Sequence, residues 1–181
     1  MSDDRRPAAG AGGLPAFLIN FAYGSNMCSR RLQQRVPSAR ALGPGTLAGH
    51  RLAWHKKGRD GSAKCDLVET GDPADQAWGV LFVIASAEKP ALDRAEGLGH
   101  GYLEKTVQIA SAGTAVPAFV YCATDIDTTL RPFDWYRALV LAGAREHGLP
   151  LSCVRGIQAV AAVADADIER ARRHFALARP F

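Results

Sequence analysis

Hydrophobic residues follow a strand-like period in the first two thirds of the chain and a helix-like period in the last third. Residues 17–23 are mostly apolar and aromatic, which predicts a buried strand. Residues 76–85 are apolar nearly throughout, which predicts a central strand covered on both faces. Residues 102–110 alternate, and a turn at residues 112–114 followed by the apolar stretch 115–124 predicts a hairpin.

Other stretches predict interrupted strands and short helices. Glycine and proline within residues 42–54 indicate bulges or sharp bends in a strand, and a short strand is expected at residues 65–69. Residues 28–36 carry Cys28, Leu32 and Val36 at every fourth position, a helical stripe. Ser25 or Asn26 is the expected N-cap of that helix. A second helix of about two turns is expected between Ser86 and Gly97.

The last third predicts three helices. The first has Asp134 as N-cap, the second begins at Leu151, and the third, near the end of the chain, has Asp165 as N-cap. The expected buried face of the last helix is Ile168, Ala171 and Phe175. Because strands come first and helices last, the pattern favours an α+β fold over a parallel α/β sheet.

Composition indicates a globular protein that is soluble and has one domain. The chain has 181 residues, of which 48% are hydrophobic and 22% are charged. No apolar run approaches the roughly 20 residues that span a bilayer, and the N-terminus lacks the apolar core of a signal peptide. We therefore expect a flexible tail over residues 1–15, a single domain over residues 16–181, no membrane association, and a cytoplasmic location.

Charge and ligand-forming residues exclude several classes of function. The net charge of +4 is mild, and the basic residues are scattered apart from residues 55–59 and 170–173, so nucleic-acid binding is not expected. The cysteines are widely spaced and the histidines show no ligand spacing, so neither a disulfide framework nor a metal site is expected. We expect no cofactor. A homodimer stays open, since no interface is evident in the pattern.

The segment Tyr23-Gly24-Ser25-Asn26 is the first candidate site, because it joins a strand, a glycine turn and a helix N-terminus. Glycine allows a ligand to approach the backbone closely, and the first turn of a helix offers N–H groups and partial positive charge. Such a turn can hold a carboxylate, a phosphate or an oxyanion. The alternative is an ordinary strand-to-helix turn with a good N-cap.

Glu96 is the candidate general acid/base. It is expected at the end of a short helix, beside the glycine-rich bend of residues 97–101. The helix dipole and partial burial both disfavour a charged carboxylate there, which suits proton transfer. The alternative is a surface glutamate at a frayed helix end. Tyr121 could offer a hydroxyl to a pocket, or could be a half-buried packing residue.

Three separated segments carry a family resemblance. They are Phe21-Ala22-Tyr23-Gly24-Ser25-Asn26, Leu92-Asp93-Arg94-Ala95-Glu96-Gly97 followed by Tyr102, and Tyr136 to Val160, and Trp78-Gly79-Val80 also fits. In this order they resemble the γ-glutamylcyclotransferase (AIG2-like) family, across most of residues 17–163. The resemblance implies a mixed, barrel-like β-sheet flanked by helices. It also implies Glu96 as general acid/base, residues 23–26 as the substrate-binding loop, and Tyr121, less securely, as a pocket tyrosine.

The resemblance further implies release of 5-oxoproline from a γ-glutamyl amide, by attack of the substrate's own α-amine on its γ-carbonyl. No water, metal or cofactor takes part in such a reaction. Two alternatives stay open. The leaving group could be another amine of a γ-glutamyl metabolite rather than an amino acid, with a polar lining from residues 55–64 favouring charged groups. The chain could also be a non-catalytic binding module of the same fold.

Overall fold

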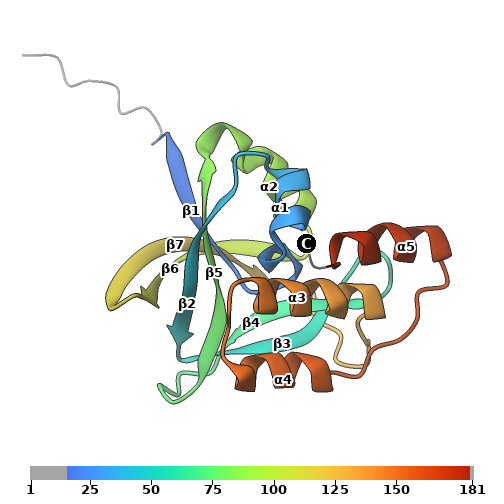
Figure 1. Ribbon diagram of the computed structural model, residues 1–181. Helices are drawn as coiled ribbons and strands as arrows, with labels where there is room; N and C mark the ends of the chain where they lie inside the picture. The colour runs from blue at the N-terminus through green and yellow to red at the C-terminus, as the bar shows by residue number, and fades with distance from the viewer. Residues whose placement is uncertain (1–15, 180–181) are drawn as a thin grey trace, which may run out of the picture.

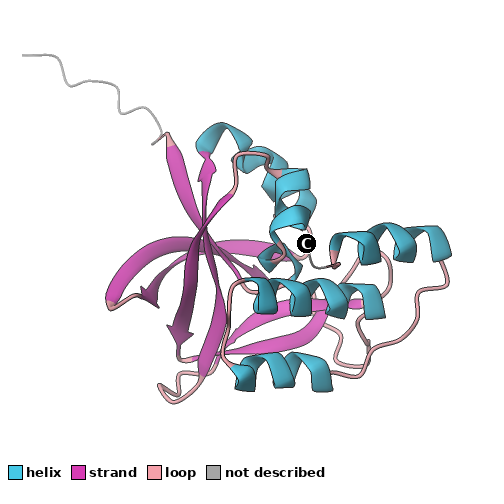
Figure 2. Cartoon of the chain, in the orientation of Figure 1, coloured by secondary structure: helices cyan, strands magenta, loops and turns pink. Residues whose placement is uncertain are grey.

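A closed barrel of five strands forms the centre of the computed structural model, which describes residues 16–179 (Figure 1). The strands in order around it are β1 (Phe17–Ala22), β5 (Gln76–Ala85), β2 (Arg40–Ala48), β6 (Tyr102–Ser111) and β7 (Thr114–Ala123). The β1–β7 pair is parallel and closes the barrel, and the other neighbouring pairs are antiparallel. With helices on one side, this confirms the predicted α+β fold with a barrel-like sheet (Figure 2). The predicted tail over residues 1–15 lies outside the described residues.

β5 pairs with β1 along one edge and with β2 along the other. Four of its side chains are at most 2% exposed, namely Val80, Leu81, Phe82 and Ile84. Consecutive buried positions show that both faces of the strand are covered, which is why it reads as an almost unbroken apolar run. The prediction for residues 76–85 is confirmed.

A second sheet pairs β3 (His50–Lys57) with β4 (Ala63–Glu69), and β3 contacts β5 while β4 contacts β7. The chain enters it from β2 through Gly49, whose φ of +69° favours glycine. The pairing of β2 with β5 also shifts register between Ala41 and Gly43. The bends predicted from glycine and proline are thus one bulge, between Ala41 and Gly43, and one turn, at Gly49.

Two short helices lie together and contact each other, α1 (Ser29–Arg35) and α2 (Lys89–Glu96). A 3-10 turn, η1 (Ser25–Met27), links β1 to α1, and another, η2 (Ser86–Glu88), precedes α2. The prediction of Ser25 or Asn26 as N-cap is wrong, because Cys28 occupies that position and no side chain caps the helix. Gly97 ends α2 with a φ of +79°, where a left-handed residue is needed.

Three further helices lie on one side of the barrel, α3 (Asp134–Glu146), α4 (Leu151–Ala159) and α5 (Ile168–Leu177), and α4 and α5 both pack against α3 (Figure 1). The prediction of Asp134 as N-cap is wrong, because Phe133 occupies that position and Asp134 is the first residue of α3. The buried face of α3 contains Tyr136, Leu139, Val140 and Gly143 as expected, and Trp135 in addition. No helix within residues 16–179 has the length and apolar content needed to cross a membrane.

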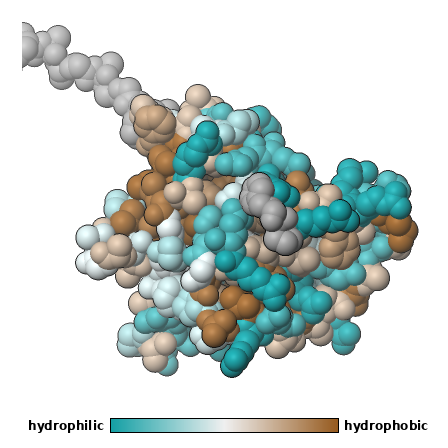
Figure 3. All heavy atoms as spheres, in the orientation of Figure 1, coloured by the Kyte–Doolittle hydropathy of each residue, from teal (hydrophilic) through white to brown (hydrophobic). Residues whose placement is uncertain are grey.

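The prediction for α5 is wrong in two respects. Its N-cap is Asp167, whose carboxylate accepts the Arg170 N–H at 2.9 Å, and not Asp165. Ile168 and Phe175 are 65% and 39% exposed, so they form no buried face. Hydrophilic residues cover most of the visible side of α5 (Figure 3). Polar contacts hold the helix together with the partial packing of Ala171 and Leu177 against the core, and hydrophobic periodicity does not detect the polar part.

Candidate active site

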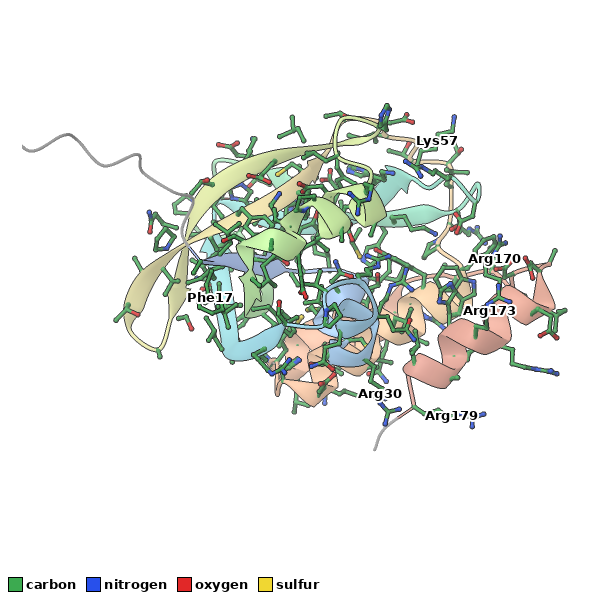
Figure 4. All side chains as sticks on the ribbon, turned by 90° about the horizontal axis from the view of Figure 1, so that it is seen from above. Phe17, Arg30, Lys57, Arg170, Arg173 and Arg179 are labelled. Atoms are coloured by element: carbon green, nitrogen blue, oxygen red, sulfur yellow. The ribbon has the colours of Figure 1, made fainter. Side chains whose placement is uncertain are left out.

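Two adjoining cavities open where η1, α1, α2 and the β3–β4 hairpin meet, and they share Ser25, Glu96, Tyr102 and Tyr136. Figure 4 shows α1 and α2 in the middle of the view, with the end of β3 at Lys57 and α5 at Arg170 on one side of them. The larger cavity has a volume of about 200 Å³. Its other lining residues are Arg31, Arg35, Lys56, Gly58, Arg59, Asp60, Lys64 and Ala95.

Glu96 stands at the junction of the cavities and is held by two side chains. Its Oε1 accepts a hydrogen bond from Asn26 Nδ2 at 2.8 Å and forms an ion pair with Arg35 Nη1. The same Arg35 nitrogen donates to Asn26 Oδ1 at 2.8 Å, so the three groups form one cluster. Within residues 16–179, no hydrogen-bond partner contacts Oε2. One carboxylate oxygen is therefore fixed, and the other is available to a ligand.

The chain brings these groups together through the ends of three elements. Asn26 lies in η1, Arg35 is the last residue of α1, and Glu96 is the last residue of α2. A carboxylate at a helix C-terminus faces an unfavourable dipole, as the sequence indicated, and the guanidinium of Arg35 opposes that effect. The ion pair with Arg35 fixes the Glu96 carboxylate at the point where the two cavities meet.

Ser25 faces the larger cavity from η1 and is tied to α1. Its Oγ accepts from Arg31 Nε at 3.0 Å, and Arg31 Nη1 lies 3.1 Å from His174 Nδ1 on α5. Burial disfavours the charged form of Arg31, and the neighbouring Arg35 disfavours a second cation beside it. Together they lower the pKa of Arg31 to about 10. Arg31 stays charged near neutral pH, so it can attract an anion.

All four tyrosines of the chain line the smaller cavity. The Tyr23 hydroxyl donates to the backbone carbonyl of Tyr121, and the Tyr102 hydroxyl donates to the carbonyl of Cys65 at 2.6 Å. The Tyr136 hydroxyl accepts the Cys65 N–H at 3.0 Å. Burial raises the pKa of Tyr23, Tyr102 and Tyr136 well above the ordinary value, so their hydroxyls stay neutral. The result is a rigid wall that carries no charge of its own.

Tyr121 contributes its ring to this wall, while its hydroxyl contacts α2. The hydroxyl donates to Asp93 Oδ1 at 2.6 Å. Burial and this carboxylate both raise the pKa of Tyr121. Because Asp93 and Glu96 are three residues apart on the same helix, the bond helps to orient the helix that carries Glu96. This explains how Tyr121 reaches the cavity without pointing its hydroxyl into it.

Gly24 also allows close packing around the loop. A β-carbon there would lie 3.1 Å from Cys65 Cβ and 3.2 Å from the Tyr136 hydroxyl, so the glycine allows these residues to pack closely on the loop. In the 3-10 turn that follows, the Met27 N–H bonds the Gly24 carbonyl at 3.0 Å. The structure thus brings the whole segment Tyr23–Asn26 to the cavity that Glu96 lines.

Sequence reasoning missed the basic character of the larger cavity. Arg31 and Arg35 lie on the helix after the loop, and Lys56 and Arg59 come from the basic run of residues 55–59. That run was the available signal, since it belongs to the segment 55–64 that was considered as a polar lining for charged leaving groups. No cluster of three or more metal-ligating side chains occurs within residues 16–179. All four cysteines are free thiols.

Comparisons with known proteins agree with this geometry. Residues 76–156 match the model of the AIG2-like family. Over 147 residues the chain is 28% identical to a γ-glutamylcyclotransferase of Homo sapiens and 27% identical to one of Bos taurus, and each match covers 78% of both chains. A solved γ-glutamyl cyclotransferase structure aligns with a TM-score of 0.75 and 23% identity, covering 87% of this chain and 99% of the other.

The resemblance to the γ-glutamylcyclotransferase (AIG2-like) family is confirmed. The chain has the γ-glutamylcyclotransferase fold, in which the barrel and its flanking helices are shared with that structure. The segment that matches the AIG2-like model contains Glu96, Tyr102, Tyr121 and Tyr136. The loop Tyr23–Asn26 precedes that segment, and it is joined to the segment by the bond from Asn26 to Glu96.

Proposed function

We propose that this chain is an enzyme, a γ-glutamylcyclotransferase that releases 5-oxoproline from a γ-glutamyl amide. The observation that carries the proposal is the Glu96 carboxylate, which Asn26 and Arg35 hold by one oxygen at the junction of two cavities. The similarity to γ-glutamylcyclotransferases over most of the chain supports the same reaction.

Glu96 acts in both halves of the proposed reaction. The neutral α-amine of the substrate attacks its own γ-carbonyl, and Glu96 takes a proton from that amine as the new C–N bond forms. The amide C–N bond then breaks, and Glu96 returns the proton to the departing nitrogen. The atoms balance without water, because the substrate rearranges into 5-oxoproline and a free amine. The tethered nucleophile supplies an effective concentration of about 10⁵ M or more.

The segment Tyr23–Asn26 and the tyrosine wall hold the γ-glutamyl group in this proposal. Backbone N–H groups of Gly24, Ser25 and Asn26 stabilise the oxyanion that forms on the γ-carbonyl, a contribution of about 3–4 kcal/mol per donor in other enzymes. Tyr121 binds the substrate through its ring, since its hydroxyl is engaged by Asp93. The reaction is an intramolecular acyl transfer, which places the enzyme among the transferases or the amide-cleaving lyases.

The leaving group of the proposed substrate occupies the larger cavity. Lys56, Gly58, Arg59, Asp60 and Lys64 line it, so part of the segment 55–64 gives the cavity a polar lining. A γ-glutamyl amino acid fits best, because its leaving group carries a carboxylate that the cations of this cavity attract. A γ-glutamyl amine without that carboxylate loses the attraction.

The test is release of 5-oxoproline from γ-glutamyl dipeptides, γ-glutamyl amines and glutathione, measured by mass spectrometry. We expect Glu96→Gln to lower turnover by at least about 10²-fold, the low end for acid/base catalysis, with an unchanged melting temperature. Glu169→Gln on α5, where the side chain is 68% exposed, is the matched control and retains activity.

Wild-type activity in Glu96→Gln would contradict the assignment of Glu96 as general acid/base. If no compound releases 5-oxoproline, thermal stabilisation by the same compounds would identify a binding module instead of an enzyme. Neither release nor stabilisation would contradict both readings of the site.

A further inference from the structure

The larger cavity holds more positive charge than its carboxylates neutralise. Five cationic side chains line it, but only two carboxylates do, Glu96 and Asp60. Glu96 pairs with Arg35, and Asp60 pairs with Lys64 at 2.8 Å. Within residues 16–179, no carboxylate lies within 4.0 Å of the other three cations, which are Arg31, Lys56 and Arg59.

Lys56 shows that this imbalance is built into the fold. The residue is only 5% exposed, and its ammonium lies 4.7 Å from the centre of the Tyr102 ring. Burial lowers the pKa of Lys56, and the carboxylates of Glu96 and Asp125 act on it from beyond ion-pair distance. A buried cation without an ion pair is costly. A protein that keeps one beside a reactive carboxylate gains most when a ligand supplies the missing negative charge.

The three cations come from different parts of the cavity wall. Arg31 lies on α1 beside Ser25, Lys56 lies near the end of β3, and Arg59 is an exposed residue of the hairpin loop. The side-chain carboxamide of Asn26 and the tyrosines bring no further charge. A ligand that contacts all three cations therefore needs negative charge at more than one point.

We propose that the substrates of this site are γ-glutamyl amides whose leaving group is an acidic amino acid, with a second carboxylate beside its α-carboxylate. The proposal rests on the γ-glutamylcyclotransferase activity proposed above and narrows its substrate class. Such a leaving group brings two carboxylates into the larger cavity, where Arg31, Lys56 and Arg59 have no ion pair. A neutral amino acid as leaving group brings only one.

The experiment compares substrates that differ in charge and hardly in shape. They are γ-glutamyl-glutamate against γ-glutamyl-glutamine, and γ-glutamyl-aspartate against γ-glutamyl-asparagine, with kcat/KM measured from 5-oxoproline release. We expect the acid of each pair to be favoured by at least about tenfold, mainly through KM, the factor expected of one charge-assisted contact. If 5-oxoproline is released but kcat/KM for the acid is no higher than for the matching amide, this inference is overturned and the proposed function stands. No release from any γ-glutamyl amide overturns both.

Variants connect the preference to named cations. Lys56→Gln and Arg59→Gln should each bring the acid-to-amide ratio of kcat/KM toward one, while Arg59→Lys should keep most of the preference. Arg155→Gln, at an exposed position of α4 outside the cavity, is the matched control and keeps the wild-type ratio. Because Arg59 is exposed, its variants test the idea even if Lys56→Gln unfolds. A preference that survives Arg59→Gln and a folded Lys56→Gln unchanged contradicts the proposal.

Discussion

At the residue scale, the orientation of Glu96 depends on a single guanidinium from another helix. Arg35 Nη1 contacts both Glu96 Oε1 and Asn26 Oδ1, so it fixes the carboxylate and the amide that also binds it. The Arg35 and Glu96 side chains are 21% and 18% exposed, which shields the pair from water and salt better than a surface pair. Arg35 is thus a positioning residue for the proposed base.

Arg35→Gln should lower kcat by roughly 10–100-fold, because a hydrogen bond between charged groups contributes about 1.5–3 kcal/mol. Arg35→Lys should recover part of the loss, since an ammonium keeps the charge and lacks the planar geometry. The measurement is kcat and KM for one γ-glutamyl dipeptide, together with the melting temperature of each variant. A loss of stability with kcat unchanged would show a structural role only.

The predicted site residues came from short sequence motifs. The structure shows why such motifs identify only some of the residues of the site. Asn26 and Glu96 belong to two predicted segments, and a 2.8 Å bond joins them across 70 residues of sequence. Arg35 lies 61 residues from Glu96 in the sequence. The sequence places it in the helix predicted over residues 28–36, and the pattern of that helix does not mark it as a site residue. Contacts between helix ends depend on how the elements pack, which a local pattern does not encode.

At the element scale, α3 fixes the turn that carries Asn26. A β-carbon at Gly143 would lie 2.3 Å from the backbone carbon of Met27 and 2.4 Å from the nitrogen of Cys28. The absence of a side chain lets α3 pack directly on the backbone of η1, which is the closest approach that two elements can make. The position of Asn26, and through it that of Glu96, follows from this contact.

Gly143→Ala should therefore destabilise the protein by about 1–3 kcal/mol and lower the proposed activity as η1 shifts. The matched control is Gly156→Ala in α4, where nothing lies within 4 Å of the new β-carbon. Because alanine favours a helix over glycine, that variant should gain about 0.4–1 kcal/mol. Chemical denaturation of both variants measures the difference. Equal stability of the two would mean that the contact between α3 and η1 is not as tight as described.

Strands were easier to predict than helix ends. β5 and the β6–β7 hairpin follow from apolar runs and turn residues, because burial dominates the choice of residue in a barrel. The N-cap predictions were wrong where the predicted side chain has a stronger partner elsewhere in the fold. Asn26 bonds Glu96 instead of the first turn of α1, and Asp165 binds Arg170 and Trp135 instead of capping α5. Local preference was overridden by charged and buried partners brought by tertiary structure.

At the scale of the whole molecule, α5 connects the outer surface to the site through polar and aromatic contacts. Asp165 accepts from Trp135 Nε1 at 2.7 Å and from Arg170 Nε at 2.6 Å. His174 stacks on Trp135 with ring centres 4.1 Å apart and also contacts Arg31 of the larger cavity. No residue of α5 is fully buried, so these contacts add to the partial packing of Ala171 and Leu177 against the core.

The attachment of α5 should depend on pH. The hydrogen bonds from Arg170 hold the pKa of Asp165 well below its usual range. A carboxyl group with a lowered pKa in the folded state adds stability above its unfolded pKa of about 3.9, and this stability is lost as the pH falls below that value. Asp165→Asn should lower the melting temperature at pH 7 by roughly 3–10 °C, and the difference from wild type should shrink as the pH falls from about 5 toward 2.

Thermal unfolding at several pH values tests this dependence, and Glu169→Gln on the exposed face of α5 serves as the control with little effect. Burial and the neighbouring Arg31 lower the pKa of His174 to about 4, so His174 also titrates in this window. It does so in wild type and in Asp165→Asn, and its effect largely cancels from the difference. A gap in melting temperature that stays constant from pH 7 to pH 3 would contradict a role for the Asp165 charge and leave only the shape of the side chain to explain it.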